Sequence, residues 1–105
     1  MNITDETFDK AMRSTDKPVL LYFSAPWCVS CKKMAIVVAD LEKTTDSICI
    51  YKINVDEAPI LVERFRIMSV PTFIAFKNGI LFYKTEGPTT KNRLLMMLGI
   101  AQENK

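Results

Sequence analysis

The sequence predicts an α/β fold in which a mixed β-sheet carries helices on both faces. Residues 19–23 form a continuous apolar run, which is typical of a strand buried on both sides of a sheet. Residues 28–44 repeat apolar side chains at spacings of three and four, as an amphipathic helix does. Asn78-Gly79 lies between two strand-like runs, the strongest short-range signal for a β-hairpin. The first half therefore requires a parallel crossover and the second half an antiparallel hairpin.

In the first half, Ile3 belongs to a very short leading strand and Thr4 to Asp16 form the first helix. Thr4 is the expected cap, Asp5 and Glu6 suit the first helical turn, and Lys17-Pro18 ends the helix. The apolar face of this helix consists of Phe8, Ala11 and Met12. The strand at 19–23 then leads through a short connection into the helix at 28–44.

The second half begins with a β-branched strand from Ser47 to Val55. Asp56 is the expected cap of a short helix from Glu57 to about Phe65, whose first turn tolerates Pro59. Strands at 72–76 and 80–85 form the hairpin, and Thr89 or Thr90 caps a last helix. The apolar face of that helix consists of Leu94, Leu95, Met97 and Leu98.

Composition places the chain among ordinary globular proteins and excludes several function classes. Its 105 residues predict a single domain, residues 1–105, and its net charge is only +2. Because no basic block and no apolar run of about 18 residues occurs, we expect neither nucleic-acid binding nor a membrane span. No secretory signal is visible, so the reducing cytosol is the expected compartment.

Cys28-Val29-Ser30-Cys31 is the most informative motif in the chain. It follows the apolar strand and opens a helix, where backbone N–H groups and the helix dipole favour a thiolate. Two cysteines at this spacing can close a small disulfide ring, which predicts redox chemistry. The alternatives are two ordinary buried cysteines or half of a zinc site. Zinc usually takes four ligands, and the chain has no histidine and only Cys49 besides. We expect Cys49 to be a small buried hydrophobe, with a regulatory thiol as the alternative.

The chain resembles the thioredoxin family over nearly its whole length. The stretches that carry the resemblance are 17–23, Ala25-Pro26-Trp27-Cys28-Val29-Ser30-Cys31-Lys32, Tyr51 to Asp56, and Val70-Pro71-Thr72-Phe73, with Asn78-Gly79 and Gly87 at family glycine positions. The resemblance implies the thioredoxin fold, with five strands and four helices. It also implies a cis peptide bond between Val70 and Pro71, and a substrate groove lined by Trp27, Ser69, Val70, Pro71 and Gly87.

The resemblance further implies the chemistry, in which protein disulfides are reduced by dithiol–disulfide exchange. Cys28 would be the exposed nucleophile that forms a mixed disulfide, and the more buried Cys31 would resolve it. No bound cofactor and no metal are expected, because electrons come from a separate partner that resembles thioredoxin reductase. We expect a cytoplasmic monomer that acts in electron transport and cell redox homeostasis.

Three departures from the family pattern concern the residues that tune the site. Val29-Ser30 replaces the usual Gly-Pro, and Ser30 adds an N–H and a hydroxyl, so we expect a potential less negative than about −270 mV. Tyr22 replaces a buried aspartate, so Cys31 should lose its proton more slowly, and Lys52 should bond Tyr22 or turn outward. Ile36 replaces a proline that kinks the helix, so this helix should be straighter.

Several alternatives stay open from the sequence. The altered dipeptide favours a thiol oxidase or isomerase, and the missing carboxylate favours a non-catalytic binding module. A glutaredoxin is disfavoured by the Trp-Cys start of the motif and by the Lys52 segment. Trp27 could instead be core filler, and Pro71 an ordinary edge-strand proline. The methionines, including Met34, Met68, Met96 and Met97, are expected to fill the core, with Met68 as a possible partner contact.

Overall fold

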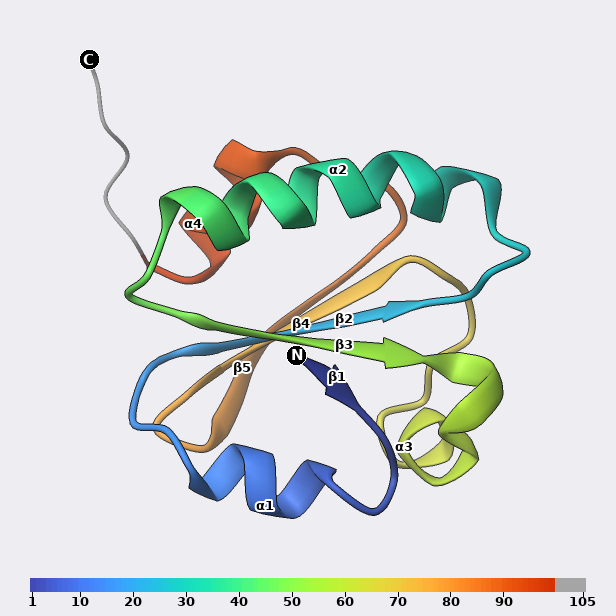
Figure 1. The fold of residues 1–105 in the computed structure, drawn as a ribbon, viewed down its shortest axis with the longest axis horizontal. Helices are drawn as coiled ribbons and strands as arrows, with labels where there is room; N and C mark the ends of the chain where they lie inside the picture. The colour runs from blue at the N-terminus through green and yellow to red at the C-terminus, as the bar shows by residue number, and fades with distance from the viewer. Residues whose placement is uncertain (100–105) are drawn as a thin grey trace.

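The computed structural model describes residues 1–99, in which a five-stranded sheet lies between two layers of helices (Figure 1). The strand order is β1-β3-β2-β4-β5. The elements in chain order are β1 (Asn2–Ile3), α1 (Phe8–Arg13), β2 (Val19–Ser24), α2 (Val29–Thr44), β3 (Cys49–Asn54), the 3₁₀ segment η1 (Val55–Glu57), α3 (Pro59–Arg64), β4 (Thr72–Lys77), β5 (Ile80–Glu86) and α4 (Lys91–Met97). This architecture confirms the predicted mixed sheet.

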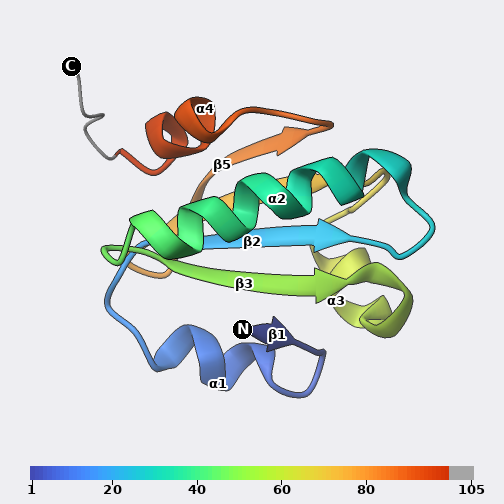
Figure 2. The same ribbon diagram turned by 45° about the horizontal axis from the view of Figure 1, so that its top comes forward.

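β2 lies at the centre of the sheet and explains the apolar run in the sequence. Leu21 and Phe23 point into a core with α1 and α3, whereas Leu20 and Tyr22 point into a second core with α2 and α4. The two helical layers cover opposite faces of the sheet (Figures 1 and 2). A strand with both faces covered has no polar face, so its residues read as continuous hydrophobicity.

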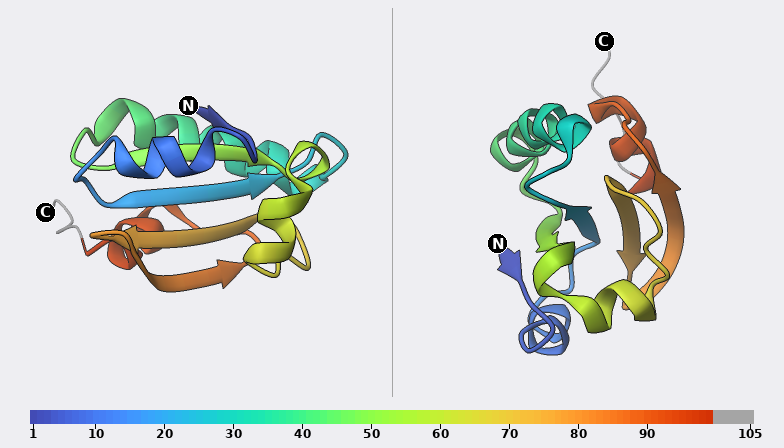
Figure 3. Two further views of the ribbon diagram at one scale, coloured as in Figure 1. Left: turned by 90° about the horizontal axis from the view of Figure 1, so that it is seen from below. Right: turned by 90° about the vertical axis from the view of Figure 1, so that its right-hand side faces the viewer.

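Strand direction places three carboxyl ends at one edge of the sheet. β1, β3 and β2 run parallel, while β4 pairs antiparallel with β2 and β5 antiparallel with β4 (Figure 3). The hairpin prediction is confirmed, because Asn78 and Gly79 connect β4 to β5 with φ of 55° and 78°. Positive φ at both positions is the type I′ turn that fits twisted strands. The β2–α2 connection leaves from the edge where the parallel strands end.

The first helix differs from its prediction at both ends. α1 spans Phe8–Arg13, shorter than 4–16, and Thr4 does not cap it: the Thr4 N–H donates instead to the Thr7 hydroxyl at 2.9 Å. Asp5 does not serve the first turn of α1 either. Its carboxylate accepts hydrogen bonds from the N–H groups of Ile60 and Leu61, at 3.1 and 3.0 Å. Two backbone donors in the first turn of α3 thereby gain an acceptor.

The predicted cap of the third helix was therefore wrong. α3 starts at Pro59 after the 3₁₀ segment, and Ala58 at its N-cap position offers no side-chain acceptor. Asp56 lies within the 3₁₀ segment η1, and its carboxylate accepts the Trp27 indole N–H. The last helix follows its prediction, because the Thr90 hydroxyl accepts the Arg93 N–H at 3.2 Å.

The methionines and Cys49 divide between core and surface. Met34 and Met97 are buried as predicted, but Met68 is 84% exposed and Met96 is 67% exposed, so Met96 is not a core filler. Cys49 is half-buried and packs against the core of α1 and α3. Its thiol lies 3.2 Å from the Thr15 hydroxyl, within hydrogen-bonding distance.

Candidate active site

Cys28 lies at the N-cap of α2, directly after the connection from β2. Its φ of −90° and ψ of 116° are extended, and its sulfur accepts the Cys31 N–H at 3.1 Å. Its own N–H donates to the Ala25 carbonyl at 3.2 Å, which holds the connection in a turn. A helix N-terminus leaves N–H groups without intrahelical partners, and an anionic sulfur can accept them.

The structure joins Cys28 and Cys31 in a disulfide, with Cα atoms 5.2 Å apart. Cys28 is 6% exposed and Cys31 is 4% exposed, so the expectation that Cys28 is exposed is wrong for this oxidised form. The cause is long-range packing, because Val70 and Val55 lie against the pair. The carbonyl oxygen of Val70 lies 3.7 Å from Cys28 Sγ.

The residues predicted to line the groove come from three separate segments. The Val70–Pro71 peptide bond is cis, and the Pro71 carbonyl accepts the Gly87 N–H at 2.8 Å. Ser69 is exposed, and its carbonyl accepts the Thr72 hydroxyl at 2.7 Å. Of these residues, the structure places Val70 directly against the cysteines and ties Gly87 to the same loop through Pro71.

Trp27 lies directly before Cys28 at the surface and does not fill the core. Its side chain is 66% exposed, and it lines a surface cavity of about 570 Å³ with Cys28, Val29, Ser30, Lys33 and Pro88. Its indole N–H donates to the carboxylate of Asp56, at 3.0 and 3.3 Å from the two oxygens. Sequence reasoning assigned Asp56 to a helix cap and so missed this contact. The signal was topological, because Asp56 follows β3 at the edge where β2 also ends.

The two residues between the cysteines differ in their surroundings. Val29 is 75% exposed on the rim of that cavity. Ser30 places its hydroxyl 3.5 Å from Cys28 Sγ. A hydroxyl at this position can donate to a Cys28 thiolate, which stabilises the reduced form of the pair.

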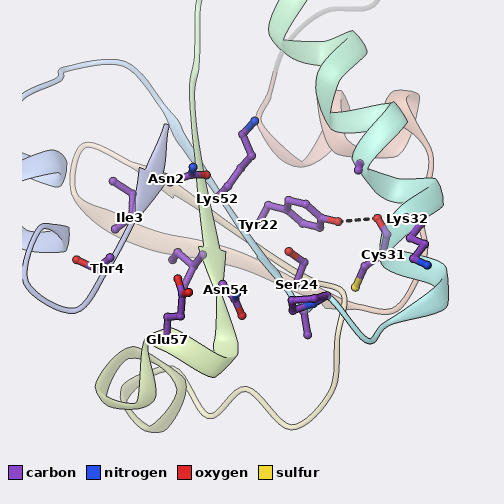
Figure 4. Close-up of a pocket in the computed structure, with 14 residues that line it drawn as sticks. Asn2, Ile3, Thr4, Tyr22, Ser24, Cys31, Lys32, Lys52, Asn54 and Glu57 are labelled. Carbon is purple, nitrogen blue, oxygen red and sulfur yellow. Dashed lines mark hydrogen bonds between the residues drawn. The ribbon is translucent and has the colours of Figure 1, made fainter.

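Tyr22 and Cys31 both line a second cavity, of about 440 Å³ (Figure 4). The Tyr22 side chain is buried at this cavity. Its hydroxyl donates to the Cys31 carbonyl at 3.0 Å. Burial raises the pKa of Tyr22 above its usual value, and a hydrogen bond with Ser24 opposes that rise in part. The phenol therefore stays neutral at physiological pH.

Lys52 pairs with Tyr22 across the β2–β3 register, but its ammonium does not bond the phenol. It lies 3.2 Å from the Glu42 carboxylate, and Figure 4 shows it pointing away from the Tyr22 hydroxyl. Of the two predicted alternatives, the structure therefore shows the outward orientation.

The cavity beside Tyr22 and Cys31 is lined by Asn2, Ile3, Thr4, Tyr22, Ser24, Ala25, Pro26, Cys31, Lys32, Ala35, Lys52, Ile53, Asn54 and Glu57.

Two properties of residues 1–99 bear on other functions. In that part of the chain, no group of three or more His, Cys, Asp or Glu side chains is arranged to hold a metal ion. None of its helices combines the length and apolarity that a membrane crossing requires.

Known proteins of one family are similar to this chain. The family model Thioredoxin matches residues 1–99. A thioredoxin of Alicyclobacillus acidocaldarius subsp. acidocaldarius is 45% identical over 80 residues, which cover 75% of this chain and 75% of that protein. A thioredoxin of Rickettsia bellii is 34% identical over 95 residues, 90% of each chain.

A plant relative is longer. The chloroplastic thioredoxin Y2 of Arabidopsis thaliana is 37% identical over 93 residues, which cover 88% of this chain but only 56% of that protein. The chain thus spans little more than half of this relative and most of the bacterial ones. The family model and the bacterial relatives agree with the fold and with the Cys28–Cys31 disulfide: the chain belongs to the thioredoxin family of thiol–disulfide oxidoreductases.

Proposed function

We propose that this protein reduces disulfides in other proteins, with Cys28 as the nucleophile and Cys31 as the resolving cysteine. The observation that carries the assignment is the position of Cys28 Sγ at the N-terminus of the 16-residue helix α2, where it accepts the Cys31 N–H at 3.1 Å. Cys31 lies one turn into the helix and lines the cavity of about 440 Å³ beside Tyr22. The helix terminus stabilises a thiolate best at Cys28.

The reaction proceeds in two exchanges. The Cys28 thiolate attacks one sulfur of the substrate disulfide, and the other substrate sulfur leaves as a thiolate that takes up a proton. Cys31 then loses its proton and attacks Cys28 Sγ, which forms the observed intramolecular disulfide and releases the second substrate thiol. A reductase returns two electrons and two protons to the pair, so the protein itself requires no bound cofactor.

The surface around Cys28 supports a protein substrate. Trp27 and Val29, which line a cavity with Cys28, are 66% and 75% exposed, and large exposed apolar side chains beside a reactive centre favour contact with a polypeptide. The Val70 carbonyl, 3.7 Å from Cys28 Sγ, can accept a backbone N–H of an extended substrate segment. We infer that this segment lies between Trp27 and the loop formed by Ser69, Val70, Pro71 and Gly87.

The cellular setting is also a proposal. We infer that the chain acts as one domain and as a monomer, in the cytoplasm, with a reductase of the thioredoxin-reductase type as electron donor. A cytoplasmic setting fits a pair that must be reduced again after each turnover.

Reduction of insulin disulfides by dithiothreitol tests the assignment. The wild type should accelerate the reaction, and Cys28→Ser should fall to the rate of dithiothreitol alone. Cys49→Ser is the matched control, since Cys49 is half-buried and lies on the opposite side of the sheet from α2; it should keep the wild-type rate. Full activity in Cys28→Ser would falsify the assignment.

Two other functions are separated by further measurements. The Ser30 hydroxyl near Cys28 Sγ favours a more oxidising thiol oxidase or isomerase, and a potential near that of protein disulfide isomerase, about −180 mV, would support it. The neutral phenol of Tyr22 beside Cys31 favours a non-catalytic binding module. Partner capture that persists after mutation of both cysteines would support that function.

A further inference from the structure

Tyr22 is buried, and both its ring and its hydroxyl make defined contacts. Its side chain is 3% exposed, and its ring stacks on Phe73 with centroids 5.1 Å apart and planes 13° apart. Its hydroxyl donates a hydrogen bond to the Cys31 carbonyl at 3.0 Å. The central strand is thereby attached to the residue that carries the second sulfur.

This hydrogen bond acts on the first turn of α2. A backbone carbonyl has two lone pairs, so Cys31 can accept the Tyr22 hydroxyl in addition to a helical N–H. Cys28 is held independently by its bond to the Ala25 carbonyl and by packing against Val70. Tyr22 therefore fixes Cys31 relative to a sulfur that is already in place.

From this geometry we propose that Tyr22 is a positioning residue for the resolving step, acting as a hydrogen-bond donor and not as a proton acceptor. The proposal rests on the roles of Cys28 and Cys31 given above. In this step the Cys31 thiol gives its proton to solvent, and its thiolate forms a bond to Cys28 Sγ. The bond between Cys28 and the substrate sulfur breaks, and the substrate sulfur leaves with the electron pair and takes up a proton.

The surroundings of Cys31 support solvent as the proton acceptor. The charged groups that line the cavity are Lys32 from α2, Lys52 from β3 and Glu57 from η1, and Lys52 is paired with Glu42. Two of the three are cations, which cannot accept a proton, and Figure 4 shows the third, Glu57, on the far side of the cavity from Cys31. The cavity of about 440 Å³, whose lining includes the polar side chains of Ser24 and Asn54, is large enough for several water molecules, so a proton can leave without a protein base.

Tyr51 provides a matched control on the neighbouring strand. It is also 3% exposed, and its hydroxyl also donates to a backbone carbonyl, that of Ala11, at 2.7 Å. This bond lies in the core of α1 and α3, on the other face of the sheet from α2. Tyr22→Phe and Tyr51→Phe therefore remove the same kind of hydrogen bond. Only the bond that Tyr22→Phe removes involves an active-site residue.

Stopped-flow reaction with an aryl disulfide that releases a coloured thiolate separates the two steps. The first equivalent of colour reports attack by Cys28, and the second reports resolution by Cys31. Tyr22→Phe should slow the second phase about 2- to 10-fold, the rate equivalent of one hydrogen bond, and leave the first phase unchanged. The pH midpoint of the second phase should not move. Tyr51→Phe should change neither phase, although both variants lose stability.

Each contrary result has a separate meaning. An unchanged second phase in Tyr22→Phe, or an equal slowing in Tyr51→Phe, would overturn the positioning role. A shifted pH midpoint in Tyr22→Phe would show that the phenol exchanges the proton, which also contradicts the proposal. Cys28→Ser tests the proposed function independently, because this variant should lose the first phase. A failure of the proposed function can therefore be told apart from a failure of the Tyr22 role.

Discussion

The indole N–H of Trp27 and the carboxylate of Asp56 form a hydrogen bond between the connection before α2 and the segment after β3. Both residues are exposed, so the bond fixes an aromatic side chain that the core does not hold. The pair lies at the sheet edge where the parallel strands β2 and β3 end. One wall of the proposed substrate groove therefore depends on a residue 29 positions away in the chain.

Asp56→Ala should release the Trp27 side chain. We expect the fluorescence anisotropy of this single tryptophan to fall, and insulin reduction to slow about 2- to 10-fold, because one charge-assisted hydrogen bond no longer orients the ring. Asp9→Ala is the control, since its carboxylate only pairs with Arg64 at the surface, 3.6 Å away. Unchanged anisotropy in Asp56→Ala would show that the ring is held by other contacts.

Asp5→Ala should destabilise the fold through α3. The Asp5 carboxylate accepts two N–H groups of the first turn of α3, and its removal leaves both without that acceptor. We expect the free energy of unfolding to fall by about 1–2 kcal/mol, the usual value of a helix cap, as measured by urea denaturation. Asp9→Ala should cost less than about 0.5 kcal/mol, because its surface ion pair contributes little. Equal losses in the two variants would contradict the capping role.

Ser30→Ala should make the reduction potential more negative. The Ser30 hydroxyl can donate to the Cys28 thiolate, and loss of one such bond shifts a two-electron potential by about 10–30 mV. Equilibration with glutathione measures the shift, and Val29→Ala is the control because Val29 carries no polar side-chain atom. For the wild type we expect a potential less negative than about −270 mV. A wild-type value at or below this figure, or no shift in Ser30→Ala, would refute the role of the hydroxyl.

Stability should fall steeply in strong alkali because of two buried phenols. Burial is the main cause that raises the pKa of both Tyr22 and Tyr51 above the usual value near 10. The folded state therefore holds these protons more tightly than the unfolded state. Their contribution is complete below about pH 10 and is lost as the pH rises through the raised values, by up to about 1.36 kcal/mol per pH unit and group.

Urea unfolding at about pH 9 and about pH 11 tests this dependence. The free energy of unfolding should drop more between the two pH values in the wild type than in the double variant Tyr22→Phe with Tyr51→Phe. The two proteins differ only in the two phenol hydroxyls, so the comparison isolates the phenols. The same drop in both proteins would mean that the phenols ionise freely in the folded state.

Several local features of the fold were predicted correctly from neighbouring residues, although the bounds and the cap of α1 were not. The run at 19–23 has no polar face because helices cover both sides of β2, and Asn78-Gly79 adopts the two positive φ values that its turn requires. The place of Cys28 at the start of α2 also follows from neighbouring residues. Each of these features depends on a few adjacent positions and on backbone preferences.

The features that the sequence did not reveal are contacts between distant segments. Asp5 satisfies α3 from 55 and 56 residues away, and Asp56 bonds Trp27 in place of capping a helix. Cys28 is buried because Val70, 42 residues later, packs against it. Periodicity and capping rules describe one element at a time, so they cannot assign a polar side chain to a partner on another element.

Capture of a mixed disulfide tests the central claim most directly. In Cys31→Ser the resolving thiol is absent, so a substrate protein should remain bound to Cys28 through a disulfide that intact-mass spectrometry detects and dithiothreitol removes. Peptide mapping should place the link at Cys28, and the variant Cys28→Ser should capture nothing under the same conditions. A covalent adduct at Cys31 or Cys49 in Cys28→Ser, together with none at Cys28 in Cys31→Ser, would contradict the account.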